Sequence, residues 1–376
     1  MMNTKVILDE IKRKTDLMME KIDTEKPLEP RHQSVNGIYT DCFETFFRPN
    51  WTYSFYLGNV ILMYYYTGEE KYLDYLKKAK GPYTDHLFNN EAEIGHDSGF
   101  LYSLYAVNMY KITGEKVYRE LALKAADEVA KRFRFEPKHI QAFFDMRIRG
   151  INDEISLMIV DDMMNMNLIM WAYGETGHSF YRDVYENHLN TAVNYLIRDD
   201  FSTRHAYHFD VKSGKPVCEM NYCGKEIGSY WSRGTAWIIY GLTKAIEFTG
   251  SGDRYRYPLE GVLSKYMKAL NGEAIPKWDF RDYDENAPYD SSAAAIVASA
   301  IMEFDKISVN EVLKEKAKKL AGETAKELCG EKYFCSREKE CLIDYGIGEG
   351  TLWGDYFFTE LIMKLHMGSK LPDMWL

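Results

Sequence analysis

The sequence predicts an all-α protein folded as an (α/α)6 barrel, in which six inner helices are surrounded by six outer helices. Three observations lead to this fold class. A helical hairpin with a Thr-Gly pair at the end of its first helix recurs along the chain. The first helices are apolar on nearly all sides whereas the second helices have a charged face, and no strand-rich block competes with them. The irregular spacing of the Thr-Gly pairs disfavours a solenoid, whose repeats keep a fixed period.

The N-terminal segment is expected to pack outside the main body of the barrel. Residues 4–22 place apolar side chains at helical spacing, and a polar, Pro-containing stretch follows. We therefore divide the chain into an N-terminal helix and linker, residues 1–36, and a single barrel domain, residues 37–376. Acidic residues interrupt every apolar run at the start of the chain, which predicts neither a secretion signal nor a membrane span. The expected location is the cytoplasm.

Glycine marks the ends of four first helices, because it adopts the left-handed conformation that terminates a helix at little cost. The four pairs are Thr67-Gly68, Thr113-Gly114, Thr176-Gly177 and Thr249-Gly250. A fifth hairpin is expected from Asp290 to Leu328, and the first helix of a sixth begins near Trp353. In such a barrel the inner helices begin at the same end, so the residues that precede them should lie close together.

The composition of the chain limits which classes of molecule it is expected to bind. The chain has 376 residues, of which 46% are hydrophobic and 15% aromatic, and its net charge is −10. Nucleic acid and anionic membranes are disfavoured because they would be repelled, and an anionic substrate would need a local positive group. The six cysteines form no CxxC pair and match no zinc signature, so free thiols and no metal site are expected.

One stretch, residues 223–241, combines the groups that an acidic sugar requires. Trp231, Arg233 and Trp237 surround a glycine, and Arg233 and Trp237 are four residues apart on one predicted helical face. An aromatic plane suits the C–H face of a sugar, and a guanidinium fork suits a carboxylate. The alternative is structural, because tryptophans on helices are usually core residues and an arginine often pairs with a neighbour.

Two aspartates precede predicted inner helices. Asp97 and Asp161 could simply cap these helices, although Asp162 could cap in place of Asp161. Paired carboxylates are the usual acid/base groups of glycoside chemistry. A helix N-terminus lowers the pKa of a carboxyl group, whereas a general acid needs a raised pKa. Burial or the charge of the second Asp must therefore raise the pKa by more than the helix lowers it. His205 lies between aromatic residues and is assigned to binding.

Six motifs make the resemblance to a known family specific. In order, HDSGF, IVDDMMN, HAYHFD, SYWSRGTAWIIYG, DSSAAAI and GTLWGDYF resemble the unsaturated glucuronyl hydrolases of glycoside hydrolase family 88, from about Trp51 to the C-terminus. The resemblance implies an (α/α)6 barrel that releases a 4,5-unsaturated uronic acid from the non-reducing end of lyase-generated oligosaccharides, such as glycosaminoglycan-type disaccharides. It implies hydration of a vinyl ether, for which neither a metal nor a cofactor is required.

The resemblance also assigns roles to residues. The implied catalytic residues are Asp97 and Asp161, and the implied substrate-binding residues are His205, Trp231, Arg233, Trp237 and Tyr56. Cys223 departs from the pattern, because the family often has a sugar-binding Gln there and a thiol is a weaker donor than an amide. Substrate preference is therefore in doubt, and Asn221 or Lys225 could supply the missing hydrogen bond.

Three alternatives stay open. An unsaturated rhamnogalacturonyl hydrolase of glycoside hydrolase family 105 would have the same barrel and chemistry, although its arginine motif more often reads RGNGW than RGTAW. A sugar epimerase would need histidines where this chain has aspartates. A non-catalytic helical-repeat binding scaffold would not require Asp, Trp and Arg at one end of the barrel. The aglycone sugar and its linkage, the tolerance of sulfate and the oligomeric state are left open by the sequence.

Overall fold

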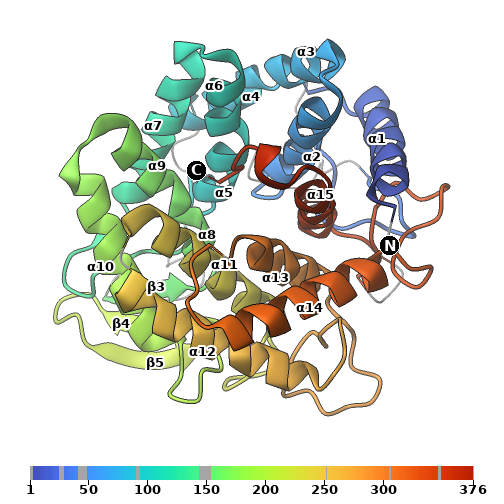
Figure 1. Ribbon diagram of the computed structural model, residues 1–376. Helices are drawn as coiled ribbons and strands as arrows, with labels where there is room; N and C mark the ends of the chain where they lie inside the picture. The colour runs from blue at the N-terminus through green and yellow to red at the C-terminus, as the bar shows by residue number, and fades with distance from the viewer. Residues whose placement is uncertain are drawn as a thin grey trace.

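The computed structural model describes residues 3–24, 29–40, 49–89, 94–143, 154–250, 252–304, 306–345 and 349–375. Its helices form two concentric layers, which confirms the predicted (α/α)6 barrel (Figure 1). The inner layer consists of α2 (Tyr53–Thr67), α5 (Ser98–Tyr102) with η2 (Ser103–Val107) and α6 (Asn108–Thr113), α8 (Asp162–Asn165) with α9 (Asn167–Thr176), α11 (Ser232–Thr249), α13 (Ser291–Phe304) and α15 (Leu352–Met367).

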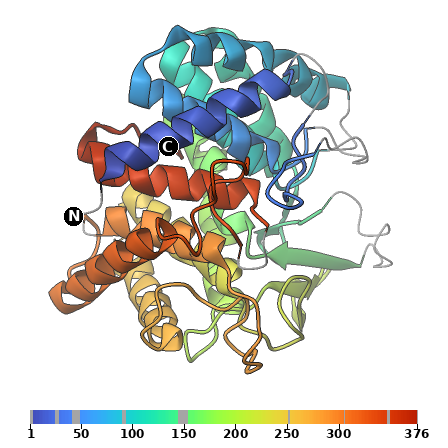
Figure 2. The ribbon, with the colours of Figure 1, turned by 90° about the vertical axis from the view of Figure 1, so that its right-hand side faces the viewer.

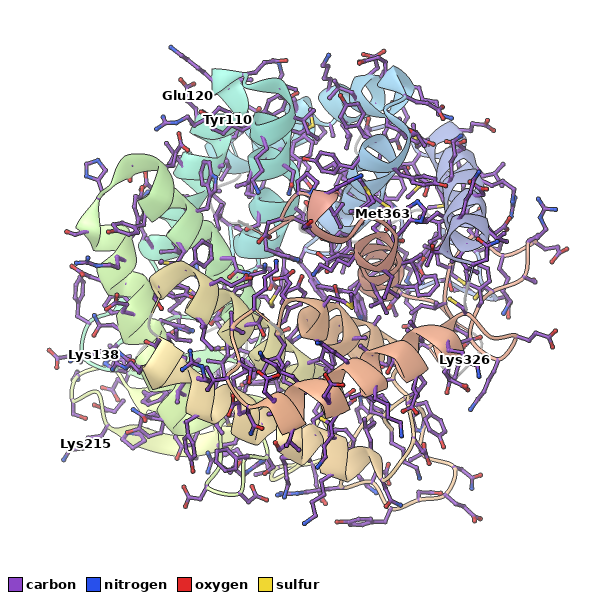
Figure 3. All side chains as sticks on the ribbon, viewed as in Figure 1. Tyr110, Glu120, Lys138, Lys215, Lys326 and Met363 are labelled. Atoms are coloured by element: carbon purple, nitrogen blue, oxygen red, sulfur yellow. The ribbon has the colours of Figure 1, made fainter. Side chains whose placement is uncertain are left out.

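The outer layer contains the helices with a charged face. It consists of α1 (Thr4–Lys21), α3 (Glu70–Lys78), α7 (Lys116–Ala130), α10 (Ser179–Leu196), α12 (Gly252–Leu270) and α14 (Glu311–Leu328), with α4 (Lys80–Asn89) added after α3 and a 3-10 turn, η4 (Gly368–Lys370), after α15. Figure 3 shows the contrast between the layers, since Met363 lies between α2 and α15 whereas Lys326 points outward from α14.

The first helix of the chain completes the ring. We expected α1 to stand outside the barrel, but it packs against α15 and α2 through the buried residues Leu8, Ile11 and Met18. It is the outer partner of α15, the helix expected to begin a sixth hairpin. The reason is burial, because α15 is apolar on nearly all sides and needs a covering helix. A domain boundary at residue 36 stays a prediction.

The Thr-Gly pairs end four inner helices as predicted. Gly68, Gly114, Gly177 and Gly250 have φ values of 70°, 70°, 70° and 62°. At the first pair the hydroxyl of Thr67 donates to the carbonyl of Met63 at 2.8 Å and accepts from the amide of Glu69 at 3.1 Å. Each pair thus caps one helix and fixes the start of the turn to the next.

Close backbone packing brings three inner helices together. A Cβ atom at Gly99 would lie 2.2 Å from the carbonyl oxygen of Asn165, and one at Gly241 would lie 2.4 Å from that of Met163. A side chain at either position would push α5 or α11 away from α8, because backbone cannot yield as a flexible side chain does. These two glycines therefore set the spacing of the helices that carry Asp97, Asp161 and Arg233.

A small sheet was not predicted from the sequence. The strands β3 (Ile155–Ile159), β4 (Ala206–Asp210) and β5 (Pro216–Met220) are antiparallel in the order β3-β4-β5, and Ile159 pairs with Ala206. The two-residue strands β1 (Phe133–Arg134) and β2 (His139–Ile140) form a second ladder. Figure 2 shows the three-stranded sheet and long connections at one end of the barrel.

A buried charge network lies near the C-terminal ends of the inner helices. The ammonium group of Lys244 is 3.0 Å from Glu247 and 2.7 Å from Asp373, and it also contacts Glu303. Lys364 contacts Glu303 at 2.5 Å. Two lysines thus pair with three carboxylates, so the cluster is a structural ion-pair network.

Candidate active site

Asp161 links the sheet to the barrel. It follows Val160, whose amide donates to the carbonyl of His205 at 2.9 Å, and it occupies the N-cap position of α8. Its side chain makes no capping hydrogen bond, Oδ2 is buried without a hydrogen bond, and 16% of the side chain is exposed. Capping therefore does not account for Asp161, and its carboxyl group is available for chemistry.

Asp97 occupies the N-cap position of α5, also without a capping hydrogen bond. Its Oδ1 accepts from Nδ2 of Asn165 at 3.0 Å and lies 3.4 Å from Nε2 of His96. Nδ1 of His96 accepts the amide of Phe143 at 3.1 Å, so the proton of the neutral ring belongs on Nε2, facing Asp97. Burial and the charge of Asp161 raise the pKa of Asp97, against the effect of His96 and Asn165. At Asp97 burial therefore outweighs the contacts that would lower the pKa.

His205 has the same arrangement beside Asp161. Its Nδ1 accepts the amides of Tyr222 and Cys223, each at 3.1 Å, which leaves the proton on Nε2. Nε2 lies 3.8 Å from Oδ2 of Asp161. The ring centroid of His205 is 4.7 Å from that of Trp231, so His205 joins the carboxylate to the aromatic part of the site.

Arg233 lies among three aromatic rings. Its guanidinium carbon is 4.6 Å from the ring centroid of Trp231, 5.1 Å from that of Trp353 and 5.7 Å from that of Tyr345. Such contacts hold a guanidinium plane in place.

The same guanidinium has a built-in counterion. Nη1 donates to Asp290 at 2.7 Å and to the hydroxyl of Tyr345 at 2.8 Å, and that hydroxyl donates to Asp290 at 2.9 Å. Burial alone would lower the pKa of Arg233, but Tyr345, Asp290 and Cys223 raise it above its usual range. Within the described part of the chain Nε and Nη2 have no hydrogen bond, so a carboxylate could still bind this edge.

Two residues predicted to bind substrate lie in the packing between helices, and their contact with substrate stays a prediction. Trp237 is fully buried against Phe100 and Phe357. Tyr56 is 3% exposed, and its hydroxyl hydrogen-bonds that of Tyr75 at 2.7 Å. Both point into the packing between helices because an inner helix is covered on all sides, so spacing along one helix could not separate the site from the core.

Five further residues belong to the site, although the sequence argument gave them no role. His96, Asn165, Asp290, Tyr345 and Trp353 all contact predicted residues. Four of them, all except Tyr345, stand in the motifs HDSGF, IVDDMMN, DSSAAAI and GTLWGDYF, which was the available signal. Trp353 takes the flanking position that the sequence argument gave to Trp237.

Cys223 lies at the edge of the site. Its amide donates to Nδ1 of His205, and its side chain is partly exposed. The two residues that could replace a glutamine here are engaged elsewhere, because Asn221 exchanges hydrogen bonds with the backbone of Gly224 and Lys225 contacts Asp282 at 2.6 Å. The thiol is therefore the polar group that stands at this position.

A helical barrel whose inner-helix starts combine two carboxyl groups, two histidines and an aromatic-bound arginine defines a carbohydrate-active enzyme of the (α/α)6 class. Comparison with proteins of known family supports this classification. The sequence profile of Glycosyl Hydrolase Family 88 matches residues 10–330. The chain belongs to this family and is a glycoside hydrolase.

Relatives with known names support the assignment over most of the chain. An unsaturated glucuronyl hydrolase of Bacillus sp. (strain GL1) is 30% identical over 331 residues, which cover 85% of this chain and 87% of that protein. An unsaturated chondroitin disaccharide hydrolase of Streptococcus pneumoniae is 27% identical, covering 97% of this chain and 92% of that protein. The crystal structure of the Bacillus sp. GL1 enzyme superimposes with a TM-score of 0.87 at 27% identity, covering 97% of each chain.

Proposed function

We propose that this enzyme releases a 4,5-unsaturated uronic acid from the non-reducing end of lyase-generated oligosaccharides, including glycosaminoglycan-type disaccharides. The observation that carries the proposal is Arg233, a positive group fixed among aromatic rings, one of which, Trp231, packs against the histidine that faces Asp161. A carboxylate-bearing sugar matches this set. The named relatives act on unsaturated glucuronyl or chondroitin substrates, and one related structure contains dGlcA-Glc-Rha-Glc.

The reaction that fits the site is hydration of a vinyl ether. The ring oxygen donates electrons into the C4=C5 bond, so protonation at C4 gives a cation at C5 that is stabilised as an oxocarbenium ion. Asp161 gives the proton to C4 and accepts one from the water that adds at C5. Asp97 holds the sugar hydroxyls and stabilises the positive charge, while Arg233 holds the C5 carboxylate. The resulting hemiketal opens and releases the aglycone.

Isotope labelling tests this reaction directly. In D₂O the product derived from the unsaturated sugar should carry one deuterium at C4, and in H₂¹⁸O the new oxygen should be found at C5. Mass spectrometry and NMR of the products measure both positions. Label at the anomeric carbon, with the double bond intact when the glycosidic bond breaks, would show direct displacement and contradict the hydration route.

Cys223→Gln tests which group contacts the aglycone. An amide offers a stronger donor and an acceptor where the thiol now stands, so we expect a several-fold change in relative kcat/KM across a panel of unsaturated disaccharides. The panel includes chondroitin-, hyaluronan-, heparin-, gellan- and pectin-derived members. Loss of ultraviolet absorbance of the C4=C5 bond gives the rates.

The control for this variant is Cys218→Gln, which changes an exposed cysteine on β5. Its relative rates should match those of the wild type. Identical relative rates for Cys223→Gln as well would mean that Cys223 does not face the substrate. A dominant rate on the pectin-derived member would favour the rhamnogalacturonyl specificity instead.

The proposal also covers the binding partners and the cellular location of the protein. None of the helices in the described ranges combines the length and the apolar composition needed to cross a membrane. The net charge of −10 disfavours nucleic acid as a partner. Cytoplasmic location is supported by the free cysteines, among them Cys335 and Cys341, whose sulfur atoms are 3.2 Å apart as thiols.

A further inference from the structure

Asn165, the last residue of α8, has a buried side chain whose two polar atoms both contact a neighbouring inner helix, the one that begins with α5. The residue is 0% exposed. Its Oδ1 accepts the backbone amide of Phe100 at 2.8 Å, and its Nδ2 donates to Oδ1 of Asp97 at 3.0 Å. Because an N–H group needs an acceptor, the oxygen of Asn165 must face Phe100 and the NH2 group must face Asp97. The Asn165 side chain therefore has one orientation and, being fully buried, contacts no substrate.

The amide that Asn165 binds is one that a helix usually satisfies with its own N-cap side chain. Asp97 is the N-cap residue of α5, and Phe100 is the third helical residue after it. An N-cap carboxylate usually accepts the amide of the second or third helical residue. Here the second amide, that of Gly99, donates to the carbonyl of His96 at 3.1 Å, and the third is bound by Asn165. Asn165 thus caps α5 from another helix, which releases the carboxyl group of Asp97 from that role.

The two carboxyl oxygens of Asp97 have different surroundings. Oδ1 accepts from Asn165 and lies 3.4 Å from Nε2 of His96. Oδ2 has no hydrogen bond to the residues that the structure describes, and 28% of the Asp97 side chain is exposed. The neighbouring donors therefore converge on one oxygen, and the other oxygen is the one open to a ligand.

Close packing of α5 against α8 makes the contact possible. A Cβ atom at Gly99 would lie 2.2 Å from the carbonyl oxygen of Asn165 and 2.4 Å from its Cα atom. A side chain as short as asparagine reaches both Phe100 and Asp97 because the two backbones approach so closely. The backbone amide of Asn165 also donates to the carbonyl of Asp161 at 3.2 Å. One residue therefore joins the turn that carries Asp161 to the carboxyl group of Asp97.

We propose that Asn165 is a positioning residue, which caps α5 in place of Asp97 and holds the Asp97 carboxyl group with Oδ2 turned toward the substrate. The proposal rests on the proposed function, in which Asp97 holds the sugar hydroxyls and stabilises the positive charge. Both tasks need an oxygen at a fixed place. Without Asn165 the buried amide of Phe100 would lack an acceptor, and Asp97, as the N-cap residue, would turn back to bind it.

A double-mutant cycle between Asn165 and Asp97 tests the proposal. We expect Asn165→Ala to lower kcat/KM for an unsaturated chondroitin disaccharide by about tenfold or more, because the carboxyl group turns away from the substrate. An Asp97→Asn enzyme has no carboxylate to position, so Asn165→Ala should lower its kcat/KM further by no more than about threefold. The loss of C4=C5 absorbance gives the rates.

Asn165→Asp separates the two contacts of the side chain. A carboxylate still accepts the amide of Phe100, but it offers no donor to Oδ1 of Asp97 and repels it. We expect kcat/KM to fall by about tenfold or more in this variant as well. If Asn165→Asp has the kcat/KM of the wild type, the donor to Asp97 is not needed and the proposal is wrong.

Asn108→Ala is the matched control. Asn108 is also fully buried on an inner helix, where its Nδ2 donates to the carbonyls of Ser103, Leu104 and Met374 at 2.9, 3.2 and 2.9 Å. Its loss should lower the melting temperature, because buried carbonyls lose their donor, and should leave kcat/KM unchanged.

The remaining outcomes also decide the question. An equal fold-loss for Asn165→Ala with and without the Asp97 carboxylate would show a structural role and overturn the proposal. If Asn165→Ala does not fold, Asn165→Asp takes its place in the cycle. A wild-type enzyme that leaves the C4=C5 absorbance unchanged would instead refute the proposed function, so the two failures are distinguishable.

Discussion

Asp161→Asn should lower kcat by at least about a hundredfold while the fold stays intact. General acid–base catalysis contributes about 10²–10⁴-fold, and asparagine cannot supply the proton to C4. Little stability should be lost, because the Asp161 side chain makes no capping hydrogen bond and asparagine is itself a good N-cap residue. Turnover is followed by the loss of C4=C5 absorbance, and thermal unfolding shows whether the variant is folded.

The comparison variant is Asp97→Asn, which should also lose activity but for a different reason. Asp97 is assigned to holding hydroxyls and stabilising charge, so its loss should affect KM as well as kcat. A folded Asp161→Asn enzyme with near-normal turnover would transfer the acid role to Asp97 or Asp162.

Arg233→Lys should reduce kcat/KM for the unsaturated disaccharide by roughly 30-fold or more, which corresponds to about 2 kcal/mol. Lysine retains the positive charge near Asp290 but lacks the planar fork that can bind Asp290 and a substrate carboxylate together. The methyl ester of the same substrate, which has no carboxylate charge, should lose much less. The measurement is the ratio of kcat/KM for acid and ester in each enzyme.

Arg233→Ala should also lower the stability of the folded protein, which Arg233→Lys should affect less. It leaves Asp290 buried without its counterion, and breaking a buried pair typically costs about 3–5 kcal/mol of stability. Arg119→Ala, which removes an arginine from a more exposed pair with Glu175, is the control and should leave kinetics unchanged. If Arg233→Lys retains wild-type kinetics on the acid, Arg233 is a structural ion-pair residue and the carboxylate binds elsewhere.

Much of the fold could be predicted from the sequence because it depends on local patterns of residues. The Thr-Gly pairs predicted where four inner helices end because a left-handed cap is a property of a few consecutive residues. Apolar and amphipathic helices alternated visibly, which predicted two layers. The aspartates at the starts of inner helices could be named as candidates for the same reason, since inner helices begin at one end of such a barrel.

The features of the fold and site that were not predicted depend on contacts between residues far apart in the sequence. Ring closure by α1 against α15 joins the two ends of the chain, and no local pattern encodes it. The same holds for the pairing of β3 with β4, for the amides that fix the histidine protons, and for Asp290 and Tyr345 beside Arg233. Contact with the guanidinium distinguishes Trp231 and Trp353 from Trp237, which packs against Phe100 and Phe357. The sequence by itself predicted where the inner helices begin and end and named candidate residues beside them, because propensity and periodicity are local. The tertiary structure alone decided which groups contact those residues, because such contacts depend on segments brought together by folding.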